Sequence, residues 1–258
     1  MTRASTSLCC IAAIFLAVGG AAQQAPAPAR DPQAVALLQA AINAMGGQAV
    51  AQSITTVSAS GSIDAGSKSF TWEDDFTSGH EFRRQLTDGF KTRLLVSGHG
   101  NPATAVDSKS KGLNQHVAYA IWPLHVPIVM LSRILQNTNY SLALGNQVTI
   151  GNSVCYEVIA KDQSGPVAKL LGSQRWCFDA TTGLPLRLEY RVPDTAYVES
   201  FEVETVDYSD FRKVSGILMP FSLVISKNGK ATNTATVDSV DLNAAIGSSE
   251  FDIAGVQQ

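Results

Sequence analysis

The spacing of apolar residues changes near residue 54, from a helical period to a period of two. Before that point the chain predicts one amphipathic helix, because apolar residues return at the spacing of a single helix face. That face is formed by Val35, Leu38, Ile42 and Met45. Asp31 is a suitable N-cap with Pro32 in the first helical position, and Gly46 would end the helix.

After the helix, apolar and polar positions alternate, which predicts an antiparallel meander of strands joined by short polar or glycine turns. The first four strands are expected at Ile54–Ile63, Lys68–Thr77, His80–Thr87 and Phe90–Ser97. Their larger apolar residues are Phe70, Trp72, Phe76, Phe82, Leu86, Leu94 and Val96. Arg84 shares the strand face of Phe82 and Leu86.

The strands are interrupted by an apolar stretch, Leu113–Gln136. Pro123 and Pro127 prevent this stretch from forming one long helix. Pro127 suits the first turn of a short central helix. The apolar side of that helix would hold Ile128, Leu131 and Ile134.

Alternation then resumes to the end of the chain. The remaining strands are expected at Ser141–Ile150, Val154–Lys161, Arg175–Ala180, Leu184–Arg191, Val198–Tyr208, Phe211–Leu218, Phe221–Lys227 and Thr232–Leu242. About a dozen strands and two helices predict an α+β fold, with one long antiparallel sheet and helices on one side of it. So many strands must curl or split, and a curled, unclosed sheet has a concave face on which residues 116–135 could lie.

The first 22 residues have the pattern of a cleavable signal peptide: one charge at Arg3, an apolar run over Leu8–Val18, and small residues before Gln23. The run is too short to span the roughly 30 Å of a bilayer core, so we expect cleavage and not anchoring. Residues 23–30 alternate Ala and Pro and predict an extended spacer. Residues 31–258 are expected to form a single domain.

Export would place the domain in the periplasm or another location outside the cytoplasm, with association with the outer membrane left open. Cys9 and Cys10 would leave with the signal peptide, so that Cys155 and Cys177 remain. These two lie in strands that could form a hairpin, and thiols of exported proteins usually pair. We therefore predict a disulfide; the alternative is a pair of free buried thiols.

Charge and motifs argue against several classes of function. The formal net charge is −3, and the sequence has no block of basic residues. It therefore lacks the clustered Lys and Arg that nucleic-acid binding needs. No later apolar run reaches the roughly 18 residues of a membrane-spanning helix. The four histidines are scattered, and the chain lacks a nucleophile elbow and a phosphate loop. We expect no metal, no cofactor and no catalytic activity.

Segments of the last third resemble the periplasmic lipoprotein-carrier superfamily, which includes lipoprotein-sorting carriers, outer-membrane lipoprotein receptors and related sensor proteins. The segments that carry this resemblance are a turn at Phe178–Pro185, a hairpin at Tyr208–Pro220, and a closing segment Val237–Asn243 followed by Phe251. The order of elements also matches from the opening helix to the last strand. Their glycines and prolines are the residue types that shape tight turns. These segments therefore indicate the fold far better than the function.

The resemblance implies an unclosed half-barrel, with the N-terminal helix and the short central helix on its concave side, and a hollow that takes acyl chains. Candidates for the apolar lining are Phe70, Trp72, Phe76, Phe82, Leu94, Val96, Trp122, Ile128, Leu131 and Ile134. Any one of them could instead be an ordinary core residue. Arg84 would point inward, where it could meet a ligand headgroup or pair with a neighbouring carboxylate. The carboxylates of residues 73–75 predict a solvated edge or a weak calcium contact.

Two functions fit these patterns. The first is an exported, non-catalytic binding protein that holds a lipid, an acyl chain or a lipidated partner in the hollow. The second is a periplasmic interaction or sensor protein whose hollow is filled by its own segment 116–135, and which contacts an envelope protein through its outer surface. A hollow with accessible apolar surface would favour the first function, and a solidly packed interior would favour the second.

Overall fold

Twelve strands form one antiparallel sheet in the parts of the chain that the computed structural model describes, which are residues 27–78, 81–89, 91–98, 104–106, 123–165, 172–193 and 201–252. The strands are β1 Thr56–Asp64, β2 Ser69–Thr77, β3 Phe82–Thr87, β4 Thr92–Ser97, β5 Thr104–Val106, β6 Tyr140–Ile150, β7 Ser153–Asp162, β8 Ser173–Asp179, β9 Pro185–Pro193, β10 Phe201–Val214, β11 Ile217–Lys227 and β12 Lys230–Leu242. Their order across the sheet is β5-β4-β3-β2-β1-β12-β11-β10-β9-β8-β7-β6.

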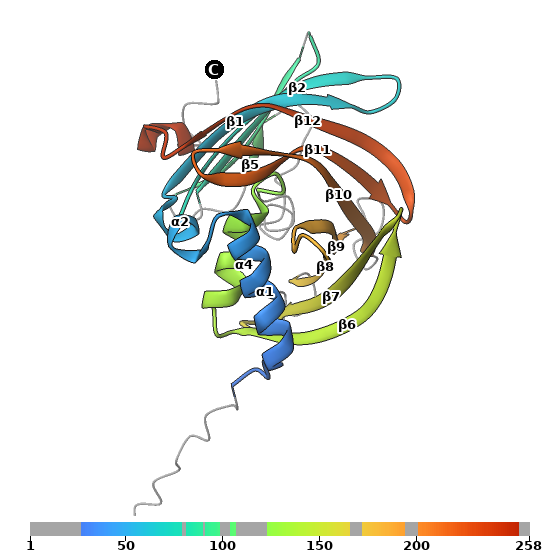
Figure 1. Cartoon of the computed structure of the whole chain (residues 1–258). Coiled ribbons are helices and arrows are strands. Elements are labelled where there is room, and N and C mark those ends of the chain that lie inside the picture. Colours follow the sequence, from blue (N-terminus) through green and yellow to red (C-terminus); the bar gives the residue numbers. More distant parts are fainter. Residues whose placement is uncertain are drawn as a thin grey trace, which may run out of the picture.

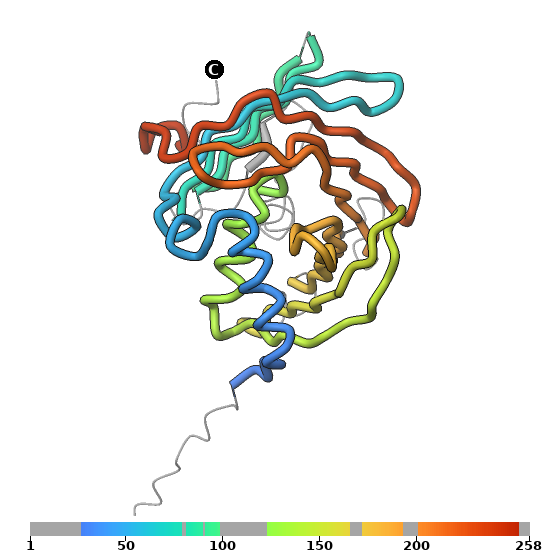
Figure 2. Tube along the Cα trace, viewed as in Figure 1, coloured from blue at the N-terminus to red at the C-terminus, as the bar shows by residue number. Residues whose placement is uncertain are grey.

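The sheet curls into a half-barrel that stays open (Figure 1). Figure 2 shows the last strand beside the first, where β12 pairs with β1 from Leu242 opposite Val57 to Thr234 opposite Asp64. The two edges are β5 and β6, which do not pair with each other in the described residues. The prediction of a strongly curved, unclosed antiparallel sheet is therefore confirmed.

Helices cover the concave side of the sheet. Helix α1 spans Pro32–Met45, α2 spans Gln48–Ser53 and α4 spans Pro127–Gln136, and the three pack against one another. Figure 1 shows α1 and α4 side by side across the opening of the curl. The sequence predicts α1 and α4 but not α2, because so short a helix shows no repeating apolar face. No helix in the described ranges is long and apolar enough to cross a membrane.

The ends of α1 follow from local chemistry. The Asp31 carboxylate accepts hydrogen bonds from the backbone N–H groups of Gln33, at 2.7 Å, and Ala34, at 3.3 Å, as an N-cap does. The helix stops at Gly46, whose φ of 139° is open to glycine. A side chain there would also approach the carbonyl oxygen of Gly216 to 3.0 Å, so the close packing of α1 on the β10–β11 turn needs this glycine.

Arginine side chains attach α4 to its surroundings. Arg30 donates to the carbonyl of Leu135 at 2.8 Å, at the end of the helix where carbonyls lack partners. Arg133 donates to the carbonyl of Thr77 at the end of β2, at 3.2 Å. The backbone N–H of Leu142 in β6 donates to Ala29 at 3.0 Å. The end of the expected spacer is thus part of the domain, and its residues before 27 lie outside the described residues.

Strand β10 corrects one prediction. The sequence predicts two strands, 198–208 and 211–218, but Phe201–Val214 is one strand. Asp210 lies between them with a φ of 54°, and the ladder passes over it: Ser209 opposes Ser222 and Phe211 opposes Pro220. The register is the same on both sides of Asp210, and the missing N–H of Pro220 suits this local gap in the ladder. The chain turns only after Val214.

The cysteine prediction is confirmed. Cys155 of β7 and Cys177 of β8 form a disulfide with their Cα atoms 5.7 Å apart. Both side chains are buried. The bridge joins neighbouring strands, and it crosslinks the part of the half-barrel that lies next to the edge strand β6.

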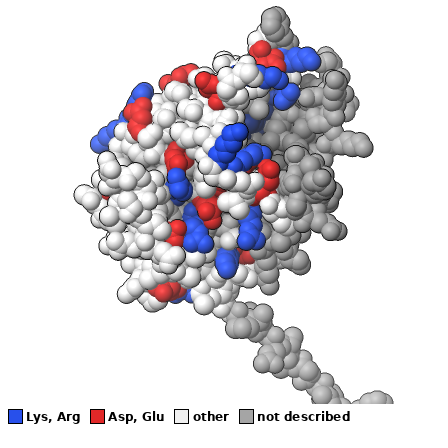
Figure 3. Space-filling model, turned by 90° about the vertical axis from the view of Figure 1, so that its right-hand side faces the viewer, with Lys and Arg blue, Asp and Glu red and all other residues white. Residues whose placement is uncertain are grey.

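Charged side chains on the outer face of the sheet largely pair with one another. Arg175 lies 3.0 Å from Glu157 and 3.4 Å from Glu189, on neighbouring strands. Arg187 binds Asp207 through two hydrogen bonds. Figure 3 shows positive and negative side chains interleaved over one side of the molecule. The Arg175–Glu189 and Arg187–Asp207 pairs are partly exposed and add little stability. The inner face differs from this outer face in being mostly apolar.

Candidate functional site in the concave hollow

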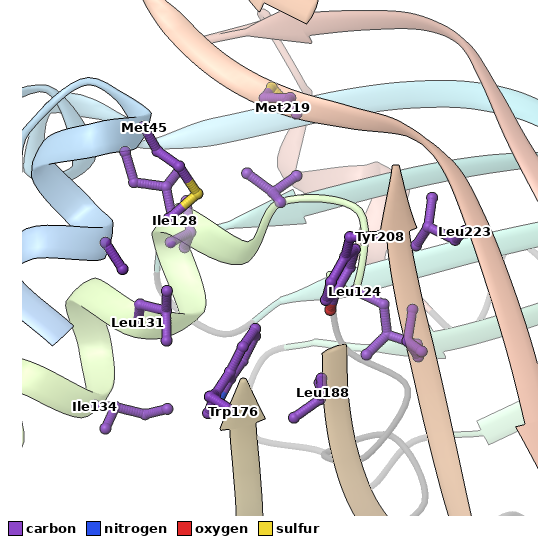
Figure 4. Packing of buried hydrophobic residues seen from close by; sticks show 14 of the residues in the cluster. Met45, Leu124, Ile128, Leu131, Ile134, Trp176, Leu188, Tyr208, Met219 and Leu223 are labelled. Atoms are coloured by element: carbon purple, nitrogen blue, oxygen red, sulfur yellow. The ribbon is translucent and has the colours of Figure 1, made fainter. Parts of the chain in front are cut away.

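The inner face of the sheet and the covering helix share one apolar cluster. Ile128, Leu131 and Ile134 are buried on α4. Figure 4 shows these three side chains pointing toward the sheet, where Trp176 and Tyr208 stand on β8 and β10. The rings of Trp176 and Tyr208 are parallel, with centroids 6.2 Å apart. The described part of the segment 116–135 therefore fills part of the hollow.

Six of the apolar residues that the sequence proposes for the lining belong to this cluster: Trp72, Phe76, Phe82, Ile128, Leu131 and Ile134. Phe70 lies on the same face of β2 as Trp72 but is only partly buried and is not one of the cluster. Trp122 lies outside the described residues. Whether any of these residues touches a ligand stays a prediction.

The expectation that Leu94 and Val96 line the hollow is wrong. In the ladder between β3 and β4, Val96 opposes Arg83 and Leu95 opposes Arg84. Directly opposed residues share a face of the sheet, so Leu95 lies on the inner face and its two neighbours lie on the outer face. Leu94, Leu95 and Val96 are all apolar, so the sequence does not show which of them point inward. The pairing of β4 with β3 decides this.

A salt bridge lies inside the hollow. The Arg84 guanidinium donates to both oxygens of Asp74, with Nε 2.7 Å from Oδ1 and Nη2 2.5 Å from Oδ2. Asp74 is 0% exposed and the Arg84 side chain is 18% exposed. Burial opposes the charge of Arg84, but Asp74 outweighs it and raises the pKa of the guanidinium. The pairing alternative for Arg84 is thus observed, and Asp74 is not a solvated edge residue.

His125 completes this polar group from the covering segment. Its Nδ1 lies 3.7 Å from Asp74 Oδ2. The centroid of its ring lies 5.1 Å from that of Trp72 and 6.2 Å from that of Phe76. Burial lowers the pKa of His125 to about 4, with Asp74 opposing and Arg84 adding to this effect. The imidazole is therefore neutral at pH 7. Its Nε2 is buried without a hydrogen-bond partner in the described residues.

Tyrosines extend the polar group across the hollow to β9 and β10. The Tyr190 hydroxyl donates to Glu204 at 2.8 Å. Burial, and then the negative charge of Glu204, raise the pKa of Tyr190, while the charge of Arg84 lowers it. Burial also raises the pKa of Tyr208. The Tyr208 hydroxyl is buried, and the described residues offer it no hydrogen-bond partner.

One strip of the inner face is not covered. The exposed large apolar side chains of the described residues are Leu144, 37% exposed, Val154, 39%, and Tyr156, 41%. Leu144 opposes buried Val158, and Tyr156 opposes buried Phe178, so the strip faces the hollow. Val154 is two residues from Tyr156 on β7, so both side chains lie on the same face of the sheet. The β6–β7 hairpin thus presents an accessible apolar surface on the inside of the curl.

Sequence reasoning misses two parts of this site, although some signal exists for each. Asp74 alternates with Trp72 and Phe76, so its inward direction is visible, but its partner depends on the register of β2 against β3. His125 lies between two prolines in the apolar segment, but nothing local indicates which strand it meets.

The hollow combines apolar walls with one neutralised ion pair and a few further polar groups. Within the described ranges, no cluster of three or more His, Cys, Asp or Glu side chains could hold a metal ion.

Comparisons with known proteins find similarity in structure only. No family model matches the sequence, and no curated protein matches it. A LolA superfamily protein from Nitrosomonas europaea has a TM-score of 0.55 and 9% identity, with 86% of this chain and 98% of that chain covered. A domain assigned to outer membrane lipoprotein sorting, from Vibrio parahaemolyticus, has a TM-score of 0.52 and 7% identity, covering 88% and 99%.

A third solved structure is similar to the same extent. It is a DUF1329 family protein from Desulfovibrio piger, with a TM-score of 0.51, 14% identity, and coverage of 87% of this chain and 99% of that one. Identities this low establish the fold and leave the function to be argued from the site. The chain therefore has the LolA-like fold, a curved and unclosed half-barrel.

Proposed function

We propose that this chain is an exported, non-catalytic binding protein that holds a lipid, an acyl chain or a lipidated partner against the inner face of its half-barrel. The observation that carries the proposal is the exposed apolar strip formed by Leu144, Val154 and Tyr156. Exposed apolar residues are ordinary when they are scattered. Here they lie together on one hairpin and face inward, which is the arrangement of a binding surface.

The surroundings of the strip suit a long apolar chain. Val158 and Phe178, which oppose its residues across the strands, are buried in the inner cluster. Burial of apolar area contributes about 25 cal/mol for each Å² removed from water, so covering the strip would favour binding. An acyl chain supplies that area without polar groups that need partners. The signal-peptide pattern of the first 22 residues supports a location outside the cytoplasm, in the periplasm.

Native mass spectrometry tests this proposal. The chain is exported to a bacterial periplasm and purified without detergent, and its mass is compared before and after denaturation. We expect lipid to co-purify and to be lost on denaturation. The variant Leu144→Asn should carry less lipid, whereas Val148→Asn, on the outer face of the same strand, should carry as much as the unmodified chain. Equal loading of all three would refute a site on the inner strip.

A second function is supported by the packing of α4. Val126, Ile128 and Leu131 are fully buried, which is the packing expected of a structural plug. An interaction or sensor protein with a filled hollow would show this packing. It would contact an envelope protein through its outer face and would carry no lipid in the mass measurement. The accessible strip on β6–β7 favours the binding function over this one.

A further inference from the structure

Polar atoms remain unused inside the hollow. Arg84 binds Asp74 through Nε and Nη2, and no described residue accepts a hydrogen bond from its Nη1. His125 Nε2 and the Tyr208 hydroxyl are buried, and neither has a hydrogen-bond partner in the described part of the chain. Buried polar groups nearly always have a partner, so each such group needs an explanation. A bound polar group is one that fits their position.

These groups are connected. His125 and Arg84 both lie beside Asp74, at the distances given above. The charge of Arg84 lowers the pKa of Tyr190 of β9, and Tyr208 lies on the neighbouring strand β10. The unused atoms of His125 and Arg84 therefore flank Asp74, and the unused hydroxyl of Tyr208 belongs to the inner cluster on β10. A ligand head held beside Asp74 could meet the first two atoms, and a further hydroxyl of the ligand could meet the third.

The net charge of the region selects against an anionic head. The positive charge of Arg84 is already matched by Asp74, which takes both of its hydrogen bonds. His125 and Tyr208 are uncharged at neutral pH. A carboxylate or phosphate placed here would lose its hydration without gaining an unpaired positive charge, and burying such an ion is costly. An uncharged head avoids that penalty.

The remaining donors and acceptors define the head further. Arg84 Nη1 and the Tyr208 hydroxyl can donate a hydrogen bond. The Nδ1 of neutral His125 faces Asp74, and we place its proton there, so that Nε2 is an acceptor. A hydroxyl group both accepts and donates and can satisfy both kinds of atom. We propose, on the basis of the binding function above, that the hollow prefers an uncharged amphiphile with a hydroxyl-bearing head, such as an acylglycerol, to a fatty-acid anion.

The test uses three ligands that share one acyl chain: monopalmitoylglycerol, methyl palmitate and palmitate. Their affinities for the full chain are measured near neutral pH by displacement of a bound apolar dye. We expect monopalmitoylglycerol to bind about 10-fold more tightly than palmitate, with methyl palmitate, which only accepts, between them. If none of the three binds, the proposed function fails. If all three bind equally, the binding function stands and the head preference is refuted.

Variants assign the preference to the named atoms. Tyr208→Phe removes an unpartnered hydroxyl and keeps the ring, so it should fold as stably as the unmodified chain. His125→Phe also keeps a ring but removes the contact of Nδ1 with Asp74, so its stability is measured beside its affinity. Each should bind monopalmitoylglycerol roughly 3- to 10-fold more weakly and leave methyl palmitate binding nearly unchanged. Asp74→Asn releases the charge of Arg84 and should strengthen palmitate binding. Retention of the full preference in both phenylalanine variants would overturn the proposal.

Discussion

The ring of Trp72 lies against Gly61, in space that a side chain at Gly61 would fill. A Cβ atom there would come within 2.7 Å of the Trp72 ring and within 2.0 Å of the Thr236 carbonyl oxygen. The position coincides with a register shift between β1 and β12. Trp72 in turn contacts His125, so this glycine helps to define the wall of the hollow.

The first prediction follows from that contact. Gly61→Ala should lower the free energy of unfolding by about 1–3 kcal/mol, because both the ring and the backbone of β12 must move. Denaturant titration measures the change. Gly165→Ala is the control, since nothing lies within 4 Å of a Cβ there, and it should be nearly neutral. Equal stability of the two variants would show that Trp72 does not pack on Gly61 in this way.

The second prediction concerns the inner ion pair. Asp74→Ala removes the partner of a buried charge and should destabilise the chain by about 2–4 kcal/mol, below the full penalty because water reaches part of Arg84. Asp75→Ala is the matched control. Its contact with Arg83 is longer, at 3.5 Å, and both side chains are partly exposed. It should change stability by less than about 1 kcal/mol. Similar losses for the two would place Asp74 at the surface.

The third prediction is a dependence of stability on pH. His125 has a folded-state pKa of about 4 against an ordinary value of 6.5, so the unfolded chain binds more protons between these values. The free energy of unfolding should therefore fall as pH falls from 6.5 to 4, by an amount on the order of 3 kcal/mol. The measurement compares the chain with His125→Phe, which should lack this part of the pH dependence. Identical pH profiles would mean that His125 is not buried as a neutral ring.

The fourth prediction tests whether α4 is a structural plug. Leu131→Ala removes a fully buried side chain at the helix–sheet contact and should cost about 2–5 kcal/mol. Met130→Ala, on the same helix and less buried, should cost clearly less. A mobile lid would instead lose little stability in either variant, and thermal unfolding separates the two outcomes.

Much of the fold can be predicted from local chemistry. Asp31, Pro32 and Gly46 define α1, and Pro127 defines the start of α4. Alternation finds the strands, because one face of a curved sheet must be apolar. The break expected near Asp210 is wrong because a polar residue with a positive φ can lie inside a continuous strand as well as in a turn.

The site is less predictable, since it depends on pairing between strands. The sequence places Arg84 on the inner face but does not supply Asp74 as its partner, because only the register of β2 against β3 brings the two together. In the same way, a run of three apolar residues hides that Leu95, and neither Leu94 nor Val96, faces inward. His125 reaches the site through tertiary packing of a segment that has no periodicity of its own.

The most direct test of the account is to locate a bound ligand by photo-crosslinking. A monoacylglycerol with a diazirine near the end of its acyl chain is bound to the full chain and irradiated, and the labelled residues are identified by tandem mass spectrometry. A ligand held in the hollow should be crosslinked to the inner face, at Leu144, Val154 or Tyr156, and not to the outer residues Val148 and Ile159. Labelling confined to the outer face, or spread equally over both faces, would contradict a ligand held in the hollow.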